Sequence, residues 1–342
     1  MCESNAKILI VALASISLLT SCSGGSPSTA TPPTSQQSQS HRATPQTSCP
    51  PCLYVANFGG NGVTVYPVGT KGNKKPTQYL NGSLTDLSNP TAIALDADSN
   101  MYVSNWSNSS VSVYAAGATG NVVPTAVISG SKTGLNTPSG IAIDSVNGDI
   151  YVANYYSNAK GYFNVTAYAP GSNGNVAPTA TIAGTNTGLC NPEGIVLDPS
   201  GNIYVTNGCD NAVTVYAAGS SGNAKPMQTI SGSSTDLNDP YEVALDSSLN
   251  IWVANSGNNV VSAYAAGANG NIPPISAISG SKTALNSPYG VALDASNDVY
   301  VANNSNNTIT FYTAGDTGNV KPAGTIKGAK TDLSDPEGIA IR

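Results

Sequence analysis

The sequence has a single histidine, His41, among its 342 residues. His41 lies outside the repeats described below, so acid–base catalysis and zinc ligation by histidine are excluded from those repeats. Positive charge is also scarce, because 13 lysines and arginines stand against 19 acidic residues and the net charge is −6. The chain therefore lacks the basic surface on which nucleic acids bind, and we expect no nucleic-acid partner.

Several catalytic and membrane signals are missing as well. The sequence has no Gly-x-Ser-x-Gly elbow and no phosphate-binding loop, which removes the common serine-hydrolase and nucleotide-binding motifs. Its one long apolar run, residues 8–19, is too short to span a bilayer as a mature helix. No helical periodicity follows it, so we expect an all-β protein after this run.

The apolar run ends in Leu19-Thr20-Ser21-Cys22, which resembles the cleavage box of bacterial lipoproteins. The resemblance implies that residues 1–21 are a signal peptide, that Cys22 is lipidated, and that Ser23 favours the outer membrane. An ordinary secretory signal before an unrelated cysteine is the alternative. We predict a protein of the bacterial cell envelope, at the outer membrane or cell surface, that contacts the membrane only through its lipid anchor.

Residues 22–51 are rich in serine, threonine, proline and glutamine and nearly free of apolar side chains. Such a segment cannot bury enough surface to fold, and we predict a disordered tether. The folded domain is then expected over residues 52–342.

Six copies of one unit fill this domain. In one copy, residues 194–198 and 203–207 read as apolar strands joined by a turn containing Pro199 and Gly201. An aromatic residue in the second strand recurs at spacings of 48, 49, 53, 48 and 48 residues, at Tyr54, Tyr102, Tyr151, Tyr204, Trp252 and Tyr300. Two further short strands follow in each copy. Four strands per repeat predict a six-bladed β-propeller.

The repeat boundaries are offset from the ends of the domain. The domain opens on the second strand of a pair, residues 53–57, and closes on a first strand, residues 338–342. We therefore expect the C-terminal strand to join the three N-terminal strands in one blade and close the ring. Ring closure removes the open sheet edge on which chains associate, and we expect a monomer.

The repeat pattern Pro-x-Gly-Ile-Ala-Leu-Asp, Gly-Asn-Ile-Tyr-Val-Ala-Asn and Val-Thr-Val-Tyr resembles NHL-repeat propellers and the YVTN-type surface propellers of prokaryotes. The resemblance covers the whole domain and implies a six-bladed fold without implying a chemistry, because one propeller fold carries many functions. Streptogramin lyases share the six-bladed architecture but depend on histidines, which this domain lacks.

One residue per repeat, between the proline and the glycine, is expected at the central channel. These residues are Thr91, Ser139, Glu193, Tyr241, Tyr289 and Glu337. Glu193 and Glu337 are three blades apart and should face each other, and Glu242 replaces a glycine next to Tyr241. Resemblance to gluconolactonase-type propellers makes a calcium site at Glu193, Glu242 and Glu337, or catalysis by Glu193 and Glu337, the alternative to two solvated carboxylates.

Large aromatic residues follow the second strand in three neighbouring repeats: Phe58, Trp106, Tyr155 and Tyr156. Flat rings among amides and hydroxyls suit glycans or extended peptides. The alternative is that these rings cover apolar contacts of their own loops. We expect ligand binding on this aromatic face and not in the channel.

Of the six cysteines, Cys190 precedes a first strand and Cys209 follows its hairpin partner. The hairpin register brings these two close together, which predicts a disulfide suited to an exported protein. Cys49 and Cys52 are close enough in sequence for a small local disulfide.

Two functions from different classes remain. The preferred one is non-catalytic binding or scaffolding at the cell envelope, without a cofactor, toward a glycan or an envelope protein such as an outer-membrane assembly partner. The alternative is a metal-dependent, lactonase-like hydrolase that uses calcium and the channel carboxylates.

Overall fold

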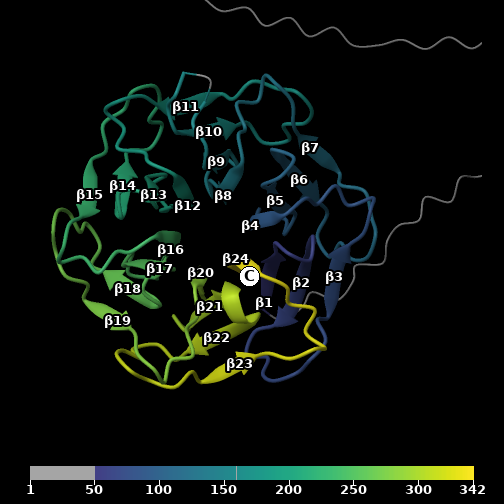
Figure 1. Ribbon diagram of the computed structural model, residues 1–342. Helices are drawn as coiled ribbons and strands as arrows, with labels where there is room; N and C mark the ends of the chain where they lie inside the picture. The colour runs from purple at the N-terminus through teal and green to yellow at the C-terminus, as the bar shows by residue number, and fades with distance from the viewer. Residues whose placement is uncertain (1–50, 159) are drawn as a thin grey trace, which may run out of the picture. The chain divides into compact units, whose positions relative to one another are not determined.

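The computed structural model describes residues 51–158 and 160–342. These residues form six four-stranded antiparallel sheets that surround a central channel, as Figure 1 shows. This confirms the predicted all-β, six-bladed propeller. The predicted signal peptide, Cys22 and the tether lie outside the described residues.

In each sheet one strand lines the channel, and the other three follow it outward toward the rim of the propeller (Figure 1). The innermost strands are β4 (Pro90–Leu95), β8 (Pro138–Ile143), β12 (Pro192–Leu197), β16 (Pro240–Leu245), β20 (Pro288–Leu293) and β24 (Pro336–Ile341). The second strands are β1 (Cys52–Asn57), β5 (Met101–Asn105), β9 (Ile150–Asn154), β13 (Ile203–Asn207), β17 (Ile251–Asn255) and β21 (Val299–Asn303).

The two outer strands complete each blade. The third strands are β2 (Gly62–Pro67), β6 (Ser110–Tyr114), β10 (Asn164–Tyr168), β14 (Ala212–Tyr216), β18 (Val260–Tyr264) and β22 (Thr308–Tyr312). The outermost strands are β3 (Gln78–Asn81), β7 (Ala126–Ile128), β11 (Ala180–Ala183), β15 (Gln228–Ser231), β19 (Ser276–Ile278) and β23 (Gly324–Ile326). Within the described ranges no helix has the length and apolarity needed to cross a membrane.

The apolar core lies between blades. The second and third strands are buried on both faces, with residues such as Val152, Val205 and Val253 fully covered. Each apolar cluster joins side chains of two adjacent sheets, for example Ile141 and Val152 of one blade with Val111 of the next. Burial on both faces explains why these strands read as continuous apolar runs.

The ring closes where β24 pairs with β1, in the register Leu53 to Ile341 and Val55 to Ile339. The resulting sheet has the order β24-β1-β2-β3, so the two ends of the domain share one blade. The C-terminal strand therefore closes the ring, as the offset repeats predicted.

A β-bulge marks the start of the innermost strands. Pro192 pairs with Asn207, but the ladder then shifts register before Ile195 pairs with Val205. The sequence prediction began this strand two residues later, at Gly194, because a proline is rare inside a regular strand. Bulges tolerate both residues and re-aim the side chain between them, which here is Glu193.

Candidate functional site

A cavity of about 520 Å³ lies at the end of the channel where the innermost strands begin. Its lining residues are Phe58, Trp106, Tyr155, Glu193, Asp239, Tyr241, Tyr289, Asn304, Asp335 and Glu337. Every one of the six blades contributes at least one of them, and we call this space the channel-mouth cavity. None of the lining residues is a lysine, arginine or histidine.

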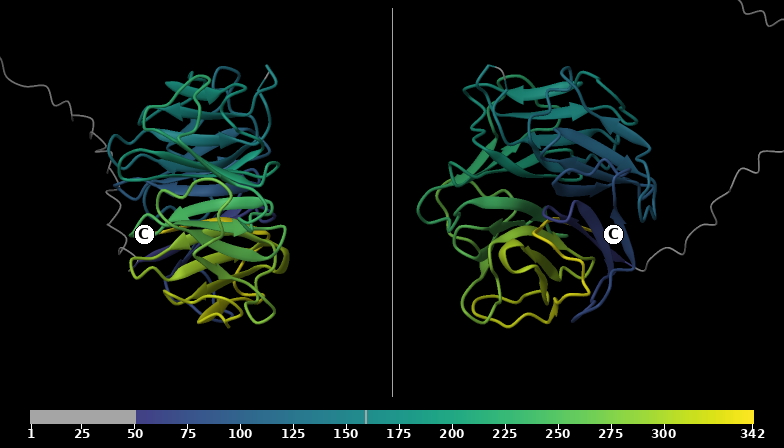
Figure 2. Two further views of the ribbon diagram at one scale, coloured as in Figure 1. Left: turned by 90° about the vertical axis from the view of Figure 1, so that its left-hand side faces the viewer. Right: turned by 45° about the vertical axis from the view of Figure 1, so that its right-hand side comes forward.

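Antiparallel pairing explains why these residues meet. The strands run between the two faces of the propeller, as the side views in Figure 2 show. The start of an innermost strand therefore lies beside the end of its second strand, and the loop that follows the second strand overhangs the same mouth. Sequence reasoning treated the aromatic loop residues and the channel residues as separate sites, whereas Phe58, Trp106 and Tyr155 line the same cavity as Glu193 and Glu337.

One wall of the cavity is a row of aromatic rings from three neighbouring blades. The ring centroids of Phe58 and Trp106 are 6.5 Å apart in an edge-to-face arrangement, and those of Trp106 and Tyr155 are 4.8 Å apart. Tyr156 extends the row outside the cavity, with its ring centroid 5.0 Å from that of Tyr155 and 52% of its surface exposed. The rings thus pack against one another and form one apolar surface.

Across the channel, β16 and β20 supply a second aromatic wall. The rings of Tyr241 and Tyr289 stack with centroids 4.1 Å apart and planes 19° from parallel. By the order of the blades in Figure 1, the blade of Tyr241 lies across the channel from that of Trp106, and the blade of Tyr289 from that of Tyr155, whereas Phe58 belongs to the blade next to that of Tyr289.

Two buried carboxyls form the floor between the walls. Glu193 and Glu337 are each 5% exposed. The Ser139 hydroxyl donates to Oε2 of Glu193 at 2.7 Å, and the Tyr241 hydroxyl donates to Oε2 of Glu337 at 2.8 Å. Burial raises the pKa of Glu193 well above its ordinary value and raises the pKa of Glu337 to about 8. Burial thus favours the protonated form of both carboxyls.

Glu242 lies deeper in the channel and does not line the cavity. Its Oε2 accepts the backbone N–H groups of Val291 at 3.1 Å and Ile339 at 3.4 Å. The other innermost strands carry glycine or alanine at this position, where a Cβ on Gly290 would lie 3.0 Å from Glu242 Oε2. Glu242 thus contacts the backbones of β20 and β24 inside the channel, and burial raises its pKa to about 8.

The three glutamates considered for calcium do not converge. Among the described residues, the one group of three potential ligand atoms lying within 4.8 Å of one another is Cys190, Cys209 and Asp210. Glu193, Glu242 and Glu337 therefore offer no preformed set of carboxylate ligands for calcium.

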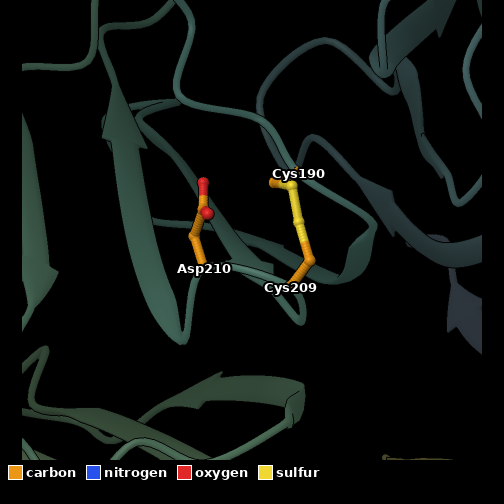
Figure 3. A group of neighbouring side chains, drawn as sticks. All are labelled: Cys190, Cys209 and Asp210. Atoms are coloured by element: carbon orange, nitrogen blue, oxygen red, sulfur yellow. A yellow bond between two sulfur atoms is a disulfide. The ribbon is translucent and has the colours of Figure 1, made fainter.

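Cys190 and Cys209 form a disulfide with Cα atoms 5.6 Å apart. Figure 3 shows the two sulfur atoms bonded to each other and the Asp210 carboxylate beside them. Sulfur in a disulfide is not a thiolate ligand, so this group does not act as a metal site. Cys52 is also disulfide-bonded, and Cys49, its expected partner, lies outside the described residues.

Three cavity residues were missed by sequence reasoning: Asp239, Asp335 and Asn304. The two aspartates immediately precede the proline that starts β16 and β24. The other four repeats have asparagine, threonine or serine at this place. The two aspartates thus depart from the repeat pattern, and this departure could have marked them as candidate site residues.

Comparison with known proteins identifies the type of propeller. Residues 77–331 match the model of a family described as lactonase, 7-bladed β-propeller. The family description names seven blades, whereas the described residues form six sheets. No curated protein matches the chain. The likeness to NHL and YVTN propellers stays a resemblance.

Solved structures share the fold. A protein of unknown function from Bacteroides caccae is 12% identical, with a TM-score of 0.62 over 85% of this chain and 98% of that chain. A chain of a nidogen/laminin complex is 18% identical, with a TM-score of 0.58 over 85% and 98%. A streptogramin B lyase is 11% identical, with a TM-score of 0.50 over 84% and 91%. At these identities the likeness extends to the fold alone.

Proposed function

The chain belongs to the family described as lactonase, 7-bladed β-propeller, and we propose that it binds a small polar ligand in the channel-mouth cavity without converting it. The observation that carries this proposal is the meeting of two aromatic walls and two buried carboxyls in one space of about 520 Å³. Apolar walls with a few well-placed polar groups are the usual composition of ligand sites of this size.

The chemistry of the cavity favours binding over turnover. Its lining contains no histidine, lysine or arginine, and the two floor carboxyls are held by the hydroxyls of Ser139 and Tyr241. Buried, hydrogen-bonded carboxyls orient a ligand well, and no basic side chain in the lining accompanies them as an acid–base partner.

The cellular setting is part of the proposal. Lipidation of Cys22, with residues 22–51 as a tether, would hold the propeller at the cell envelope as a monomer and expose the cavity to glycans or envelope peptides. Mass spectrometry of the mature N-terminus tests this, with Cys22→Ala as the control. An unlipidated N-terminus at another residue would overturn the anchor.

A binding screen tests the proposed site. Calorimetry against envelope glycans and peptides should identify a ligand whose affinity falls by one to a few kcal/mol, as for an interface anchor, in Trp106→Ala. Tyr162→Ala is the matched control, because Tyr162 is a partly exposed aromatic residue that does not line the cavity. Equal loss in both variants, or no loss in either, would place binding elsewhere.

A lactonase-like hydrolase is the second candidate, favoured by the family match and by the paired carboxyls with raised pKa. This candidate predicts lactone hydrolysis that Glu193→Gln and Glu337→Gln both abolish, measured with and without added calcium. Substrate binding without hydrolysis in the parent protein would reject it.

A further inference from the structure

We propose that the ligand of the channel-mouth cavity is an organic cation, a small molecule carrying a primary or methylated ammonium group. This inference rests on the proposed function and names its ligand class.

The first support is the pair of facing aromatic walls. Trp106 and Tyr155 come from blades that lie across the channel from those of the stacked Tyr241–Tyr289 pair, and Phe58 extends the first wall. The faces of such rings carry partial negative charge and attract ammonium groups, most strongly in a desolvated space. A neutral sugar would also stack on one wall, but rings on two sides are the arrangement that encloses a cation.

The second support is the charge of the lining. Four of its residues are acidic, namely Glu193, Asp239, Asp335 and Glu337, and none is basic. Asp239 and Asp335 are exposed at the rim, where their negative field would concentrate cations at the entrance. An anionic ligand would find no positive partner among these side chains.

The third support is an open oxygen on each floor carboxyl. The hydrogen bonds from Ser139 and Tyr241 both fall on Oε2, and among the described residues Oε1 of Glu193 and of Glu337 accepts no hydrogen bond. Gly208 follows β13 beside this floor, and a Cβ there would lie 3.4 Å from Asp239 Oδ1 and 3.7 Å from Glu193 Oε1. The glycine thus adds no side chain of its own between these two carboxylates.

A bound cation would also balance the acidic groups at the floor of the cavity. Burial, and after it the charges of Asp335 and Glu242, raise the pKa of Glu337. The titratable groups around Glu337 are all acids or tyrosines: Glu193 on β12, Tyr241 and Glu242 on β16, Tyr289 on β20, and Asp239 and Asp335 before β16 and β24. An ammonium ion would favour the ionised carboxyl, so binding should release a proton.

The test compares ligands of one shape and different charge. Choline and its neutral isostere 3,3-dimethylbutan-1-ol are titrated into the full chain by calorimetry at constant ionic strength, beside sodium chloride and neutral envelope glycans. We expect choline to bind at least about tenfold more tightly than the neutral alcohol, the ratio expected for a desolvated cation–π contact. Trp106→Ala and Glu337→Gln should each weaken choline binding, and Tyr162→Ala should not.

The outcomes separate this inference from the proposed function. Binding of neutral glycans, lost in Trp106→Ala, with choline no better than its isostere, would retain the cavity as the site and overturn the cation. Equal binding of sodium and choline would also overturn it. Absence of binding by any of these ligands would overturn both proposals. If Glu337→Gln fails to fold, Asp239→Asn at the exposed rim replaces it and should weaken choline binding.

Discussion

At the scale of single residues, tyrosine does two kinds of work in this chain. One buried tyrosine at the end of the third strand of each blade, or one residue before it, donates its hydroxyl to a threonine carbonyl in the loop before the innermost strand of the same blade, as Tyr216 does to Thr187. The hydroxyl lets an aromatic ring be fully buried without an unsatisfied donor. Tyr241 and Tyr289 instead face the cavity, where Tyr241 holds Glu337.

The buried carboxyls predict how stability depends on pH. Burial raises the pKa of Glu337 and of Glu242 to about 8 from a reference value of 4.5, so the folded protein holds protons that the unfolded chain has lost. Their stabilising contribution is complete below pH 4.5 and is lost as the pH rises toward 8. The free energy of unfolding should therefore fall between these limits, as urea titrations at several pH values will measure.

Glu337→Gln is the matched variant for this dependence. The amide keeps the shape of the side chain but does not titrate, so the fall in stability with pH should be shallower. It should not vanish, because Glu193 and Glu242 titrate in the same direction. A slope identical to that of the parent would show that Glu337 is already ionised in the folded protein.

At the scale of elements, the β12–β13 hairpin carries both the disulfide and a floor carboxyl. The bulge after Pro192 re-aims Glu193, while Cys190 and Cys209 join the segments that flank the two strands. The backbone N–H of Gly208 also donates to the Asn191 carbonyl at 3.1 Å. These constraints fix the loop beside Glu193.

Removing this disulfide should destabilise the propeller. The two cysteines are 19 residues apart in sequence, and a cross-link of that span is worth roughly 2–4 kcal/mol by restricting the unfolded chain. The Cys190→Ser, Cys209→Ser double variant should lose about that much in urea unfolding.

Reductant supplies the control. The double variant should respond to dithiothreitol only through its remaining disulfide at Cys52, and the parent should respond more strongly. Equal urea midpoints for parent and double variant under oxidising conditions would contradict the stabilising role.

At the scale of the whole molecule, stability depends on a closed ring. Each blade packs its two faces against neighbours, and loops add contacts along the rim: Gly120 bridges to Leu80, and the Asn121 side chain accepts the backbone N–H of Leu84 at 2.7 Å. The same contacts recur around the ring, so an opened ring exposes two apolar sheet faces and an unpaired edge.

Deleting residues 336–342 should therefore unfold or oligomerise the entire domain. The deletion removes only β24, but it frees the edge of β1 and takes Ile339 from an interblade cluster. Light scattering and thermal melting will measure the effect, with deletion of residues 23–44 as the control outside the propeller. A truncated monomer with the melting curve of the parent would contradict closure by β24.

The sequence by itself determined the strands, their number and the closure of the ring. Alternating turn signals and apolar runs mark each strand, and the offset between the ends of the chain and the repeats requires β24 to pair with β1. These properties are local or repeat at a fixed period, so they can be read along the chain.

Only the tertiary structure decided the composition of the site. Phe58 and Tyr289 are far apart in sequence, and their meeting in one cavity depends on how six blades close around an axis. The raised pKa of Glu337 likewise depends on burial by other blades, which no single repeat encodes. Distances across the channel, and the loss of water around its side chains, depend on the positions of all six blades. No local sequence pattern therefore contains them.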